Sequence, residues 1–242
     1  MRAWLHGLAV LAALTLSACA DHTSSSDQAE PLPPQPYGEE EANVELWLET
    51  MELSNRELYV ARDAVISALD LKKGEKVADL GAGTGLYTLL FSPILGETGV
   101  VYAVDIEPRF LRLVNQRVAD LELENVVAVL SREDDITLPH QSVDVVFIAD
   151  TYHYFADPEK VMASVRKSLK ADGRLVILDY NYDPSKANDP SRDHLRFGRD
   201  GLVDEITSFG FSTKKSPVVD GLNDFYMLEF VKADDDKSEE TP

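Results

Sequence analysis

The stretch Lys76-Val77-Ala78-Asp79-Leu80-Gly81-Ala82-Gly83-Thr84-Gly85 decides the fold of this chain. A short apolar run ends in an acid, glycines follow at every second position, and an apolar helical pattern begins at Leu86. This order predicts a strand, a tight turn and the N-terminus of a helix. Glycines permit positive φ and close approach of a ligand, while a helix N-terminus offers N–H groups and a positive partial charge. The stretch therefore predicts a site for a charged ligand that carries a nucleoside.

The glycine spacing and the flanking acids narrow the class of ligand. The dinucleotide fingerprint is G-x-G-x-x-G, but here the third glycine comes one position early and Leu86 stands where the fingerprint has glycine. Asp79 at the start of the loop suits a ligand with a cationic group better than a pyrophosphate. A second acid, Asp105, closes the apolar run 99–104 about twenty residues later, where a carboxylate at a strand tip binds ribose hydroxyls.

The loop Asp79-Leu80-Gly81-Ala82-Gly83-Thr84-Gly85, taken with Val104-Asp105, resembles the S-adenosylmethionine site of class I methyltransferases. The resemblance implies an α/β fold of the Rossmann-like, seven-stranded methyltransferase type. Such a fold has a mostly parallel sheet with a C-terminal antiparallel strand, in three layers α/β/α. The resemblance covers roughly residues 56–231, the size of one domain. The alternative is a glycine-rich turn in another α/β protein.

The family resemblance also implies which residues contact the cofactor. They are Asp79, Gly81, Ala82, Gly83, Gly85, Asp105, Ile106, Asp134, Asp135 and Asp150. In the family, an acid after the third strand accepts a hydrogen bond from the adenine amino group. Counting back from Leu138-Pro139 favours Asp134 for this role, with Asp135 as the alternative. A run of acids is also typical of a solvated loop.

The N-terminal residues predict export. The apolar run 8–16 is too short to span a bilayer as a helix, but it is typical of a signal peptide. Leu16-Ser17-Ala18-Cys19 resembles the bacterial lipobox, which implies a signal peptide over residues 1–18, cleavage before Cys19 and lipid on its sulfur. The alternatives are an ordinary secretory signal and a buried N-terminal helix. Cys19 is the only cysteine, so an intrachain disulfide is excluded.

The rest of the chain divides into three parts. Residues 19–39 are polar and rich in proline and serine, which predicts a lipidated cysteine followed by a disordered tether. Residues 40–232 are the expected methyltransferase domain with leading helices, and 233–242 an acidic disordered tail. In enteric-type sorting, Ala20 after the cysteine points to the outer membrane. We therefore expect a lipoprotein of the bacterial cell envelope that faces the periplasm.

Charge and motifs limit the partners. The formal net charge of −20 argues against nucleic acid and against an anionic membrane surface. Membrane contact is expected only through the lipid anchor, and we expect a monomer. No metal is expected, because the histidines are scattered and neither H-E-x-x-H nor C-x-x-C occurs. A serine-hydrolase elbow, G-x-S-x-G, is also absent from the sequence.

Hydrophobic periodicity predicts the elements of the domain. A leading helix is expected over 40–69, with Asn55 as the cap of a second segment from Arg56. Strands are expected at 76–80, 99–104, 126–130, 142–149, 174–179, 211–218 and 224–231, and helices from 86 and over 109–120, 161–169 and 200–209. Residues 170–173 are expected to turn, and 180–197 to form a long connection.

The exit of the strand 142–149 is the expected wall shared by cofactor and acceptor, because ligands of open α/β sheets lie beyond the carboxyl ends of strands. Methyl transfer from a sulfonium is a direct displacement that needs a general base only if the acceptor is protonated. His153 is the candidate base, since the ordinary pKa of histidine suits that role; the alternative is that it only packs there. Further candidates to contact the substrate are Tyr152, Tyr154 and His194, and Tyr59 and Arg62 are candidates to face the methionine end of the cofactor.

Three functions are compatible with these patterns. The first is an S-adenosylmethionine-dependent methyltransferase that acts by direct displacement on an unidentified small molecule or envelope acceptor. The second is a non-catalytic, lipid-anchored module that binds or senses a nucleoside, because adenosylmethionine is made in the cytoplasm. The third, a nicotinamide oxidoreductase, is disfavoured by Leu86 in the glycine loop.

Overall fold

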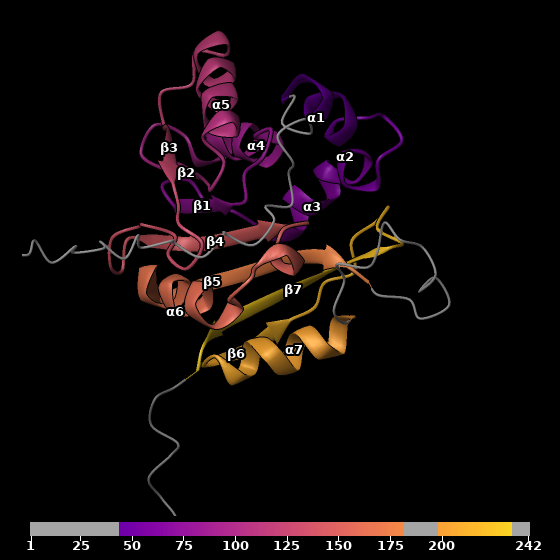
Figure 1. Ribbon diagram of the computed structural model, residues 1–242, viewed down its shortest axis with the longest axis vertical. Helices are drawn as coiled ribbons and strands as arrows, with labels where there is room; N and C mark the ends of the chain where they lie inside the picture. The colour runs from indigo at the N-terminus through magenta and orange to yellow at the C-terminus, as the bar shows by residue number, and fades with distance from the viewer. Residues whose placement is uncertain (1–43, 182–197, 234–242) are drawn as a thin grey trace, which may run out of the picture. The chain divides into compact units, whose positions relative to one another are not determined.

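The computed structural model describes residues 44–181 and 198–233, with side chains from Leu48 onward. These residues build one seven-stranded sheet with helices on both faces (Figure 1). The strands are β1 (Lys76–Leu80), β2 (Val100–Asp105), β3 (Val126–Leu130), β4 (Val143–Ala149), β5 (Leu169–Tyr180), β6 (Phe211–Lys215) and β7 (Phe225–Lys232). The helices are α1 (Val44–Met51), α2 (Glu57–Val60), α3 (Arg62–Leu69), α4 (Leu86–Leu95), α5 (Pro108–Asp120), α6 (Pro158–Ser168) and α7 (Arg199–Ser208), with a 3₁₀ turn η1 (Tyr152–Tyr154).

The strand order is β3-β2-β1-β4-β5-β7-β6, which confirms the predicted methyltransferase-type sheet. β1 pairs in parallel with β2 on one side and with β4 on the other, so that Asp79 lies opposite both Ala103 and Phe147. β7 runs antiparallel between β5 and β6. The chain leaves β1 toward β2 and later returns to β4, which places the topological switch point at the carboxyl ends of β1 and β4.

Two apolar clusters cover the two faces of the sheet. On one face, α3 and α4 pack through Val65, Phe91 and their neighbours onto Phe147 of β4. The rings of Tyr87 and Phe91 stand edge-on to Phe147, with centroids 5.0 and 5.4 Å away. Because β4 is buried on both sides, its sequence is a nearly continuous apolar run rather than an alternating one.

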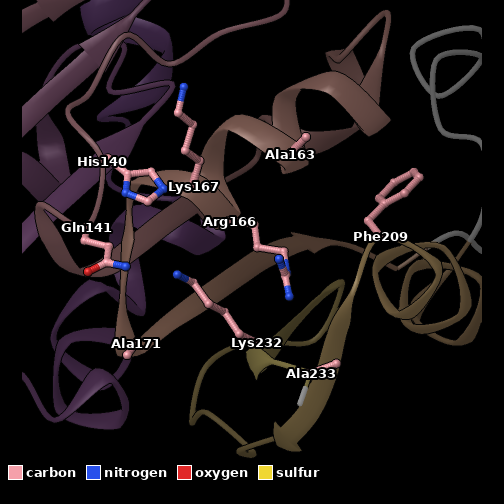
Figure 2. Close-up of a pocket in the computed structure, with 9 residues that line it drawn as sticks. All are labelled: His140, Gln141, Ala163, Arg166, Lys167, Ala171, Phe209, Lys232 and Ala233. Atoms are coloured by element: carbon pink, nitrogen blue, oxygen red, sulfur yellow. The ribbon is translucent and has the colours of Figure 1, made fainter. Parts of the chain in front are cut away.

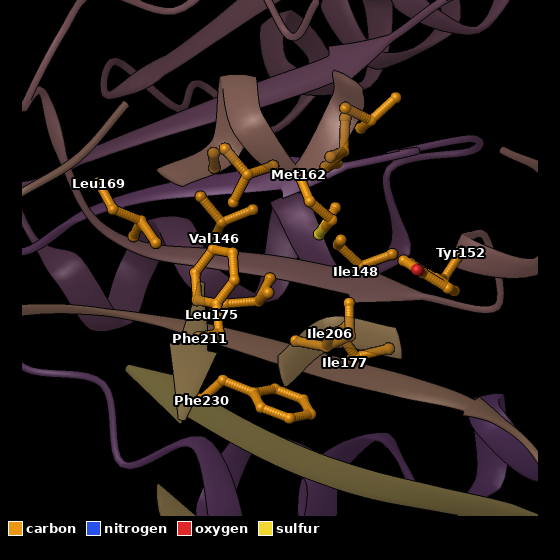
Figure 3. Packing of buried hydrophobic residues seen from close by; sticks show 14 of the residues in the cluster. Val146, Ile148, Tyr152, Met162, Leu169, Leu175, Ile177, Ile206, Phe211 and Phe230 are labelled. Carbon is orange, nitrogen blue, oxygen red and sulfur yellow. The ribbon is translucent and has the colours of Figure 1, made fainter. Parts of the chain in front are cut away.

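The opposite face is covered by α6 and α7. Figure 3 shows Met162 of α6 and Ile206 of α7 packing toward Ile148 and Ile177 of the central strands. Tyr152 of η1 belongs to the same cluster and is 1% exposed. Helices on both faces give the predicted three layers α/β/α.

Two local predictions were wrong. The second segment of the leading helix is preceded by Arg56 rather than Asn55, and it is not continuous to Leu69, because the chain leaves helical geometry at Ala61, between α2 and α3. The segment 170–173 is not a turn, because β5 already begins at Leu169, which pairs with Val143 across a bulge. Both differences come from long-range contacts that local propensity does not report.

No helix among the described residues is long and apolar enough to cross a bilayer. The predicted signal peptide, Cys19, the tether, His194 and most of the acidic tail lie outside the described residues.

Candidate functional site

The glycine loop joins β1 to α4 and has the backbone geometry that its sequence predicts. Gly81, Gly83 and Gly85 have φ of 77°, 52° and 84°, a region that favours glycine. The N–H groups of Gly81 and Ala82 donate to the Val104 carbonyl oxygen at 2.8 and 3.1 Å, which fixes the loop to β2. A Cβ atom on Gly81 would lie 2.3 Å from the Thr151 side chain, so this glycine lets the loop pack against the exit of β4.

Asp79, at the tip of β1, is 3% exposed, and its carboxylate accepts a hydrogen bond from the Thr88 hydroxyl at 2.5 Å. Burial raises its pKa to about 7, although the hydrogen bonds from Thr88 act in the opposite direction. The carboxylate therefore helps to fasten the first turn of α4. Its contact with a ligand stays a prediction.

Asp105, at the tip of β2, faces the same loop. Its carboxylate accepts hydrogen bonds from the backbone N–H groups of Gly83 at 2.8 Å and of Glu107 at 2.9 Å. Burial raises its pKa, while those two N–H groups oppose the shift. The next residue, Ile106, is 39% exposed beside it. A buried carboxylate at a strand tip, next to an exposed apolar side chain, is a suitable acceptor for ribose hydroxyls.

The segment between α1 and α2 lies against this loop. Glu52 accepts hydrogen bonds from the Thr84 hydroxyl at 3.0 Å and from Arg117 of α5 at 2.5 Å, and Arg117 also donates to the Thr84 carbonyl oxygen at 2.8 Å. A Cβ atom on Gly83 would find the Met51 sulfur 3.5 Å away. The break in the leading helix thus brings Met51 and Glu52 onto the glycine loop, a contact that sequence periodicity did not reveal.

The same segment reaches the far side of the switch point. Arg56 pairs with Asp150 at 2.5 Å and also donates to the Met51 carbonyl oxygen at 3.1 Å. The Glu57 carboxylate accepts from the backbone N–H groups of residues 223–225 at the start of β7. Residues 52–57 therefore connect the glycine loop, the exit of β4 and the beginning of β7.

The structure separates the two candidate acids after β3. Asp135 accepts hydrogen bonds from the Thr137 N–H at 2.7 Å and the Ser164 hydroxyl at 2.9 Å, and these contacts hold its pKa below the usual range. Asp134 instead lines a cavity of about 450 Å³ between this loop and the start of α6. The contact of either acid with adenine stays a prediction.

The exits of β4 and β5 bring together Asp150, His153 and Asp179, whose potential ligand atoms lie within 4.8 Å of one another. His153 Nδ1 is 2.6 Å from Asp179 Oδ1, and the same oxygen accepts the Tyr180 N–H at 2.7 Å. Asp179 was not among the residues predicted from the sequence. The available signal was its place at the carboxyl end of a strand, the same signal that located Asp79 and Asp105.

The remaining predicted substrate residues lie in different environments. Tyr152 is buried against α7, where its hydroxyl donates to Glu205, so it belongs to the core rather than to the cluster at the strand exits. The Tyr154 ring is 39% exposed and its centroid lies 4.2 Å from that of His153. Arg62 stacks over the ring of Tyr59 at 4.4 Å and donates to its carbonyl oxygen, so these two residues hold each other.

A larger cavity, of about 620 Å³, lies at the opposite ends of the strands, where β4 and β5 begin. Figure 2 shows residues that line it, among them Arg166, Lys167 and Lys232. Two of these cations lie in the last turn of α6, where they compensate the helix dipole. This cavity is therefore separate from the cluster at the carboxyl ends of the strands.

Comparison with known proteins identifies the family. The family model for "Methyltransferase domain" matches residues 71–205, more than half of the chain. The chain belongs to this methyltransferase family. The matched region contains the glycine loop, Asp105 and the exits of β4 and β5.

Curated relatives agree with the family. The chain is 35% identical over 118 residues to a ubiquinone/menaquinone biosynthesis C-methyltransferase, UbiE, of Psychromonas ingrahamii. The aligned region covers 47% of each chain. A protein of the same name in Vibrio vulnificus is 33% identical over 129 residues, covering 51% of this chain and 50% of the relative. The chain thus spans about half the length of the curated relatives it matches.

Solved structures extend the likeness to the whole fold. A SAM-dependent methyltransferase from Aquifex aeolicus superposes with a TM-score of 0.63 at 27% identity, covering 76% of this chain and 94% of that one. The [4+2]-cyclase SpnF superposes with a TM-score of 0.62 at 13% identity, covering 72% of this chain and 81% of that one. The second likeness shows the fold alone.

The family and its neighbours imply S-adenosylmethionine as the cofactor, and the residues present fit it. Asp105 offers a buried acceptor for hydroxyl donors, and the backbone of Gly83 has no Cβ to exclude a ligand. Asp79 and Asp105 place carboxyl groups, rather than cationic side chains, at the strand tips beside the loop, which suits a cationic sulfonium better than a pyrophosphate. When bound, this cofactor supplies a methyl group already activated by a positive sulfur.

Proposed function

We propose that this protein is an S-adenosylmethionine-dependent methyltransferase that transfers a methyl group to a small molecule or envelope component by direct displacement. The observation that supports the proposal best is the pairing of the glycine loop with Asp105 at the switch point of a methyltransferase-family sheet. Asp105 and the loop would hold the nucleoside, while the exits of β4 and β5 would face the acceptor. Positioning of this kind contributes several kcal/mol to the rate.

The acceptor of the curated relatives does not carry over directly. Their name states a C-methyltransferase of ubiquinone and menaquinone biosynthesis, but the match covers about half of each chain. The relatives therefore support methyl transfer and leave the acceptor to be identified.

The proposal includes a location in the cell envelope. It is supported by the lipobox-like stretch before Cys19 and by the polar residues 19–39, which separate that cysteine from the folded domain. Metabolic labelling with an alkyne fatty acid should mark the wild-type protein and not a Cys19→Ala variant. Equal labelling of both would exclude a lipid on this cysteine.

The second candidate function is a lipid-anchored module that binds the nucleoside without turnover. It is favoured by the predicted export, because adenosylmethionine is made inside the cell.

Calorimetry with adenosylmethionine and adenosylhomocysteine, followed by a turnover assay on a bacterial envelope extract, separates the two candidates. Binding with release of adenosylhomocysteine supports the enzyme. Tight binding without turnover supports the module. Absence of binding to either nucleoside excludes both.

A further inference from the structure

The cluster at the exits of β4 and β5 contains a histidine and a carboxylate in direct contact. His153 Nδ1 and Asp179 Oδ1 are 2.6 Å apart, and the two side chains are 6% and 5% exposed. We propose that His153 and Asp179 form a proton-accepting pair, and that the methyl acceptor is a hydroxylated aromatic molecule whose hydroxyl is protonated at neutral pH. This inference rests on the proposed methyl transfer and adds a role for Asp179 and a class of acceptor.

The contact with Asp179 selects one tautomer of the imidazole. A carboxylate beside Nδ1 accepts a hydrogen bond, so the neutral ring carries its proton on Nδ1 and its lone pair on Nε2. The Tyr180 N–H, which donates to the same Asp179 oxygen at 2.7 Å, fixes the orientation of the carboxylate. Asp179 is thus a positioning residue, and proton exchange with the acceptor falls to Nε2 of His153.

Charged and aromatic groups from several elements surround His153. Two carboxylates, Asp150 and Asp179, face it from the exits of β4 and β5, and Arg56 pairs with the first of them at 2.5 Å. The Tyr154 ring of η1 lies tilted beside the imidazole, and Tyr226 of β7 lies opposite Asp179 in the sheet.

The three ligand atoms of this cluster also have the proximity required for a metal ion. The partners of the two carboxylates favour proton transfer instead. Asp150 is paired with the Arg56 guanidinium, and Asp179 already accepts from the Tyr180 N–H beside its contact with His153. A metal ion would have to displace the arginine from Asp150, because a nearby guanidinium opposes binding of a cation.

The class of acceptor follows from the base and its aromatic neighbours. A thiol ionises readily near neutral pH and gains little from a base, whereas a phenolic hydroxyl stays protonated and gains most. Burial raises the pKa of Tyr154 to about 12, so its hydroxyl stays neutral and its half-exposed ring offers an apolar flank next to His153. A flat aromatic molecule with a weakly acidic hydroxyl suits both the apolar ring of Tyr154 and the imidazole of His153.

The proposed step balances without a further reactant. The acceptor oxygen provides the electron pair for the new bond to the methyl carbon, and its proton passes to Nε2 of His153. The broken carbon–sulfur bond leaves its electron pair on sulfur, which becomes a neutral thioether. The imidazolium that results keeps its Nδ1–H directed at Asp179, and it later returns the proton to solvent.

The tautomer can be measured on the full chain by long-range ¹H–¹⁵N correlation of the histidine rings at pH 8, with a His153→Gln variant to assign the signals. We expect the Nδ1–H tautomer of His153 in the wild type and its loss in Asp179→Asn. Asp172→Asn, the same change at an exposed position near the other end of β5, should keep the wild-type spectrum. An Nε2–H tautomer, or an imidazolium, in the wild type would overturn the pair.

Kinetics test the role in transfer, with 2-naphthol and 2-naphthalenethiol as matched probes. We expect Asp179→Asn to lower kcat for the naphthol by about 10²–10⁴-fold, to shift the acid limb of its pH profile, and to leave KM for adenosylmethionine unchanged. Transfer to the thiol should change by less than about tenfold, because the thiolate needs no base.

Equal kcat values for wild type and Asp179→Asn would overturn the role of the pair. The class of acceptor would be overturned if the wild type methylated only the thiol. It would also be overturned if the wild type bound adenosylmethionine but methylated neither probe. Failure to bind adenosylmethionine would instead reject the proposed function, while the tautomer measurement would still decide whether the pair exists.

Discussion

Two carboxylates lie at the tips of β1 and β2, and two more at the exits of β4 and β5. The two pairs differ in the groups that they contact. At the ends of β1 and β2, Asp79 and Asp105 accept from a threonine hydroxyl and from backbone N–H groups. At the exits of β4 and β5, Asp150 and Asp179 contact the guanidinium of Arg56 and the imidazole of His153. The first pair orders backbone around a loop, whereas the second contacts side chains that carry or exchange charge. The comparison teaches that the two halves of the candidate site differ in their partners, and the proposal above assigns cofactor binding to the first and proton transfer to the second.

Among the substitutions that test this comparison, the largest effect on kcat is expected at His153. His153→Gln should lower kcat for a hydroxyl acceptor by about 10²–10⁴-fold, because the general base is lost, and should leave the Kd of adenosylmethionine within about twofold. Steady-state kinetics and calorimetry measure the two quantities. His140→Gln, an exposed histidine at the cavity of Figure 2, is the matched control. A large loss of cofactor affinity in His153→Gln would contradict the assignment of cofactor binding and proton transfer to different halves of the site.

The next effect concerns Asp79 and pH. Burial raises its pKa to about 7 in the folded chain, above the unfolded value near 3.8, so between these limits the folded state binds more protons than the unfolded one. This carboxyl therefore lowers stability as pH rises from about 4 to 7. Asp79→Asn should stabilise the cofactor-free protein at pH 8 by on the order of 3 kcal/mol and change little at pH 4. Urea unfolding at both pH values measures this, and equal effects at pH 4 and pH 8 would contradict it.

Within the glycine loop, two positions should respond differently to alanine. Gly81→Ala combines positive φ with a Cβ 2.3 Å from Thr151, and should cost about 3 kcal/mol of folding free energy. Gly83→Ala has positive φ but no contact closer than 3.5 Å, and should cost about 1 kcal/mol. Urea denaturation compares them, and a larger loss at Gly83 would contradict the packing against Thr151.

Asp105→Ala should weaken cofactor binding by about 1–3 kcal/mol, because charge-assisted hydrogen bonds to the ribose are lost. Asp105→Asn keeps an acceptor oxygen for only one of the two N–H groups, because Gly83 donates to Oδ2 and Glu107 to Oδ1, and it should lose less affinity than the alanine variant. Calorimetry with adenosylhomocysteine gives both values. Unchanged affinity in the alanine variant would place the ribose elsewhere.

The smallest effect is expected for the segment that connects the two halves. Arg56→Met removes the ion pair with Asp150, whose side chains are about a quarter exposed, and should lower stability by about 1 kcal/mol. Thermal unfolding measures it, with Lys160→Met, which breaks an exposed pair with Asp157, as the control. Equal losses in the two variants would show that the Arg56 pair behaves like an ordinary surface contact.

The sequence predicted the cofactor half in detail and the other half only in part. The glycine loop and Asp105 were legible because turn chemistry and strand ends leave local patterns. Asp179 left no such pattern beside His153, since the two are 26 residues apart and meet only through the parallel pairing of β4 and β5. Tyr152 shows the opposite limit, because an aromatic next to His153 in sequence turns into the core against α7.

By itself, the sequence determined the order of strands and helices, the shape of the glycine loop and the place of the acids at the tips of β1 and β2, because hydrophobic period and glycine backbone freedom act over a few residues. Only the tertiary structure decided that Glu52 and Arg56 reach opposite sides of the switch point, and that His153 meets Asp179. Those contacts join residues far apart in the chain, and the packing of a whole sheet, rather than any local preference, brings them within hydrogen-bonding distance.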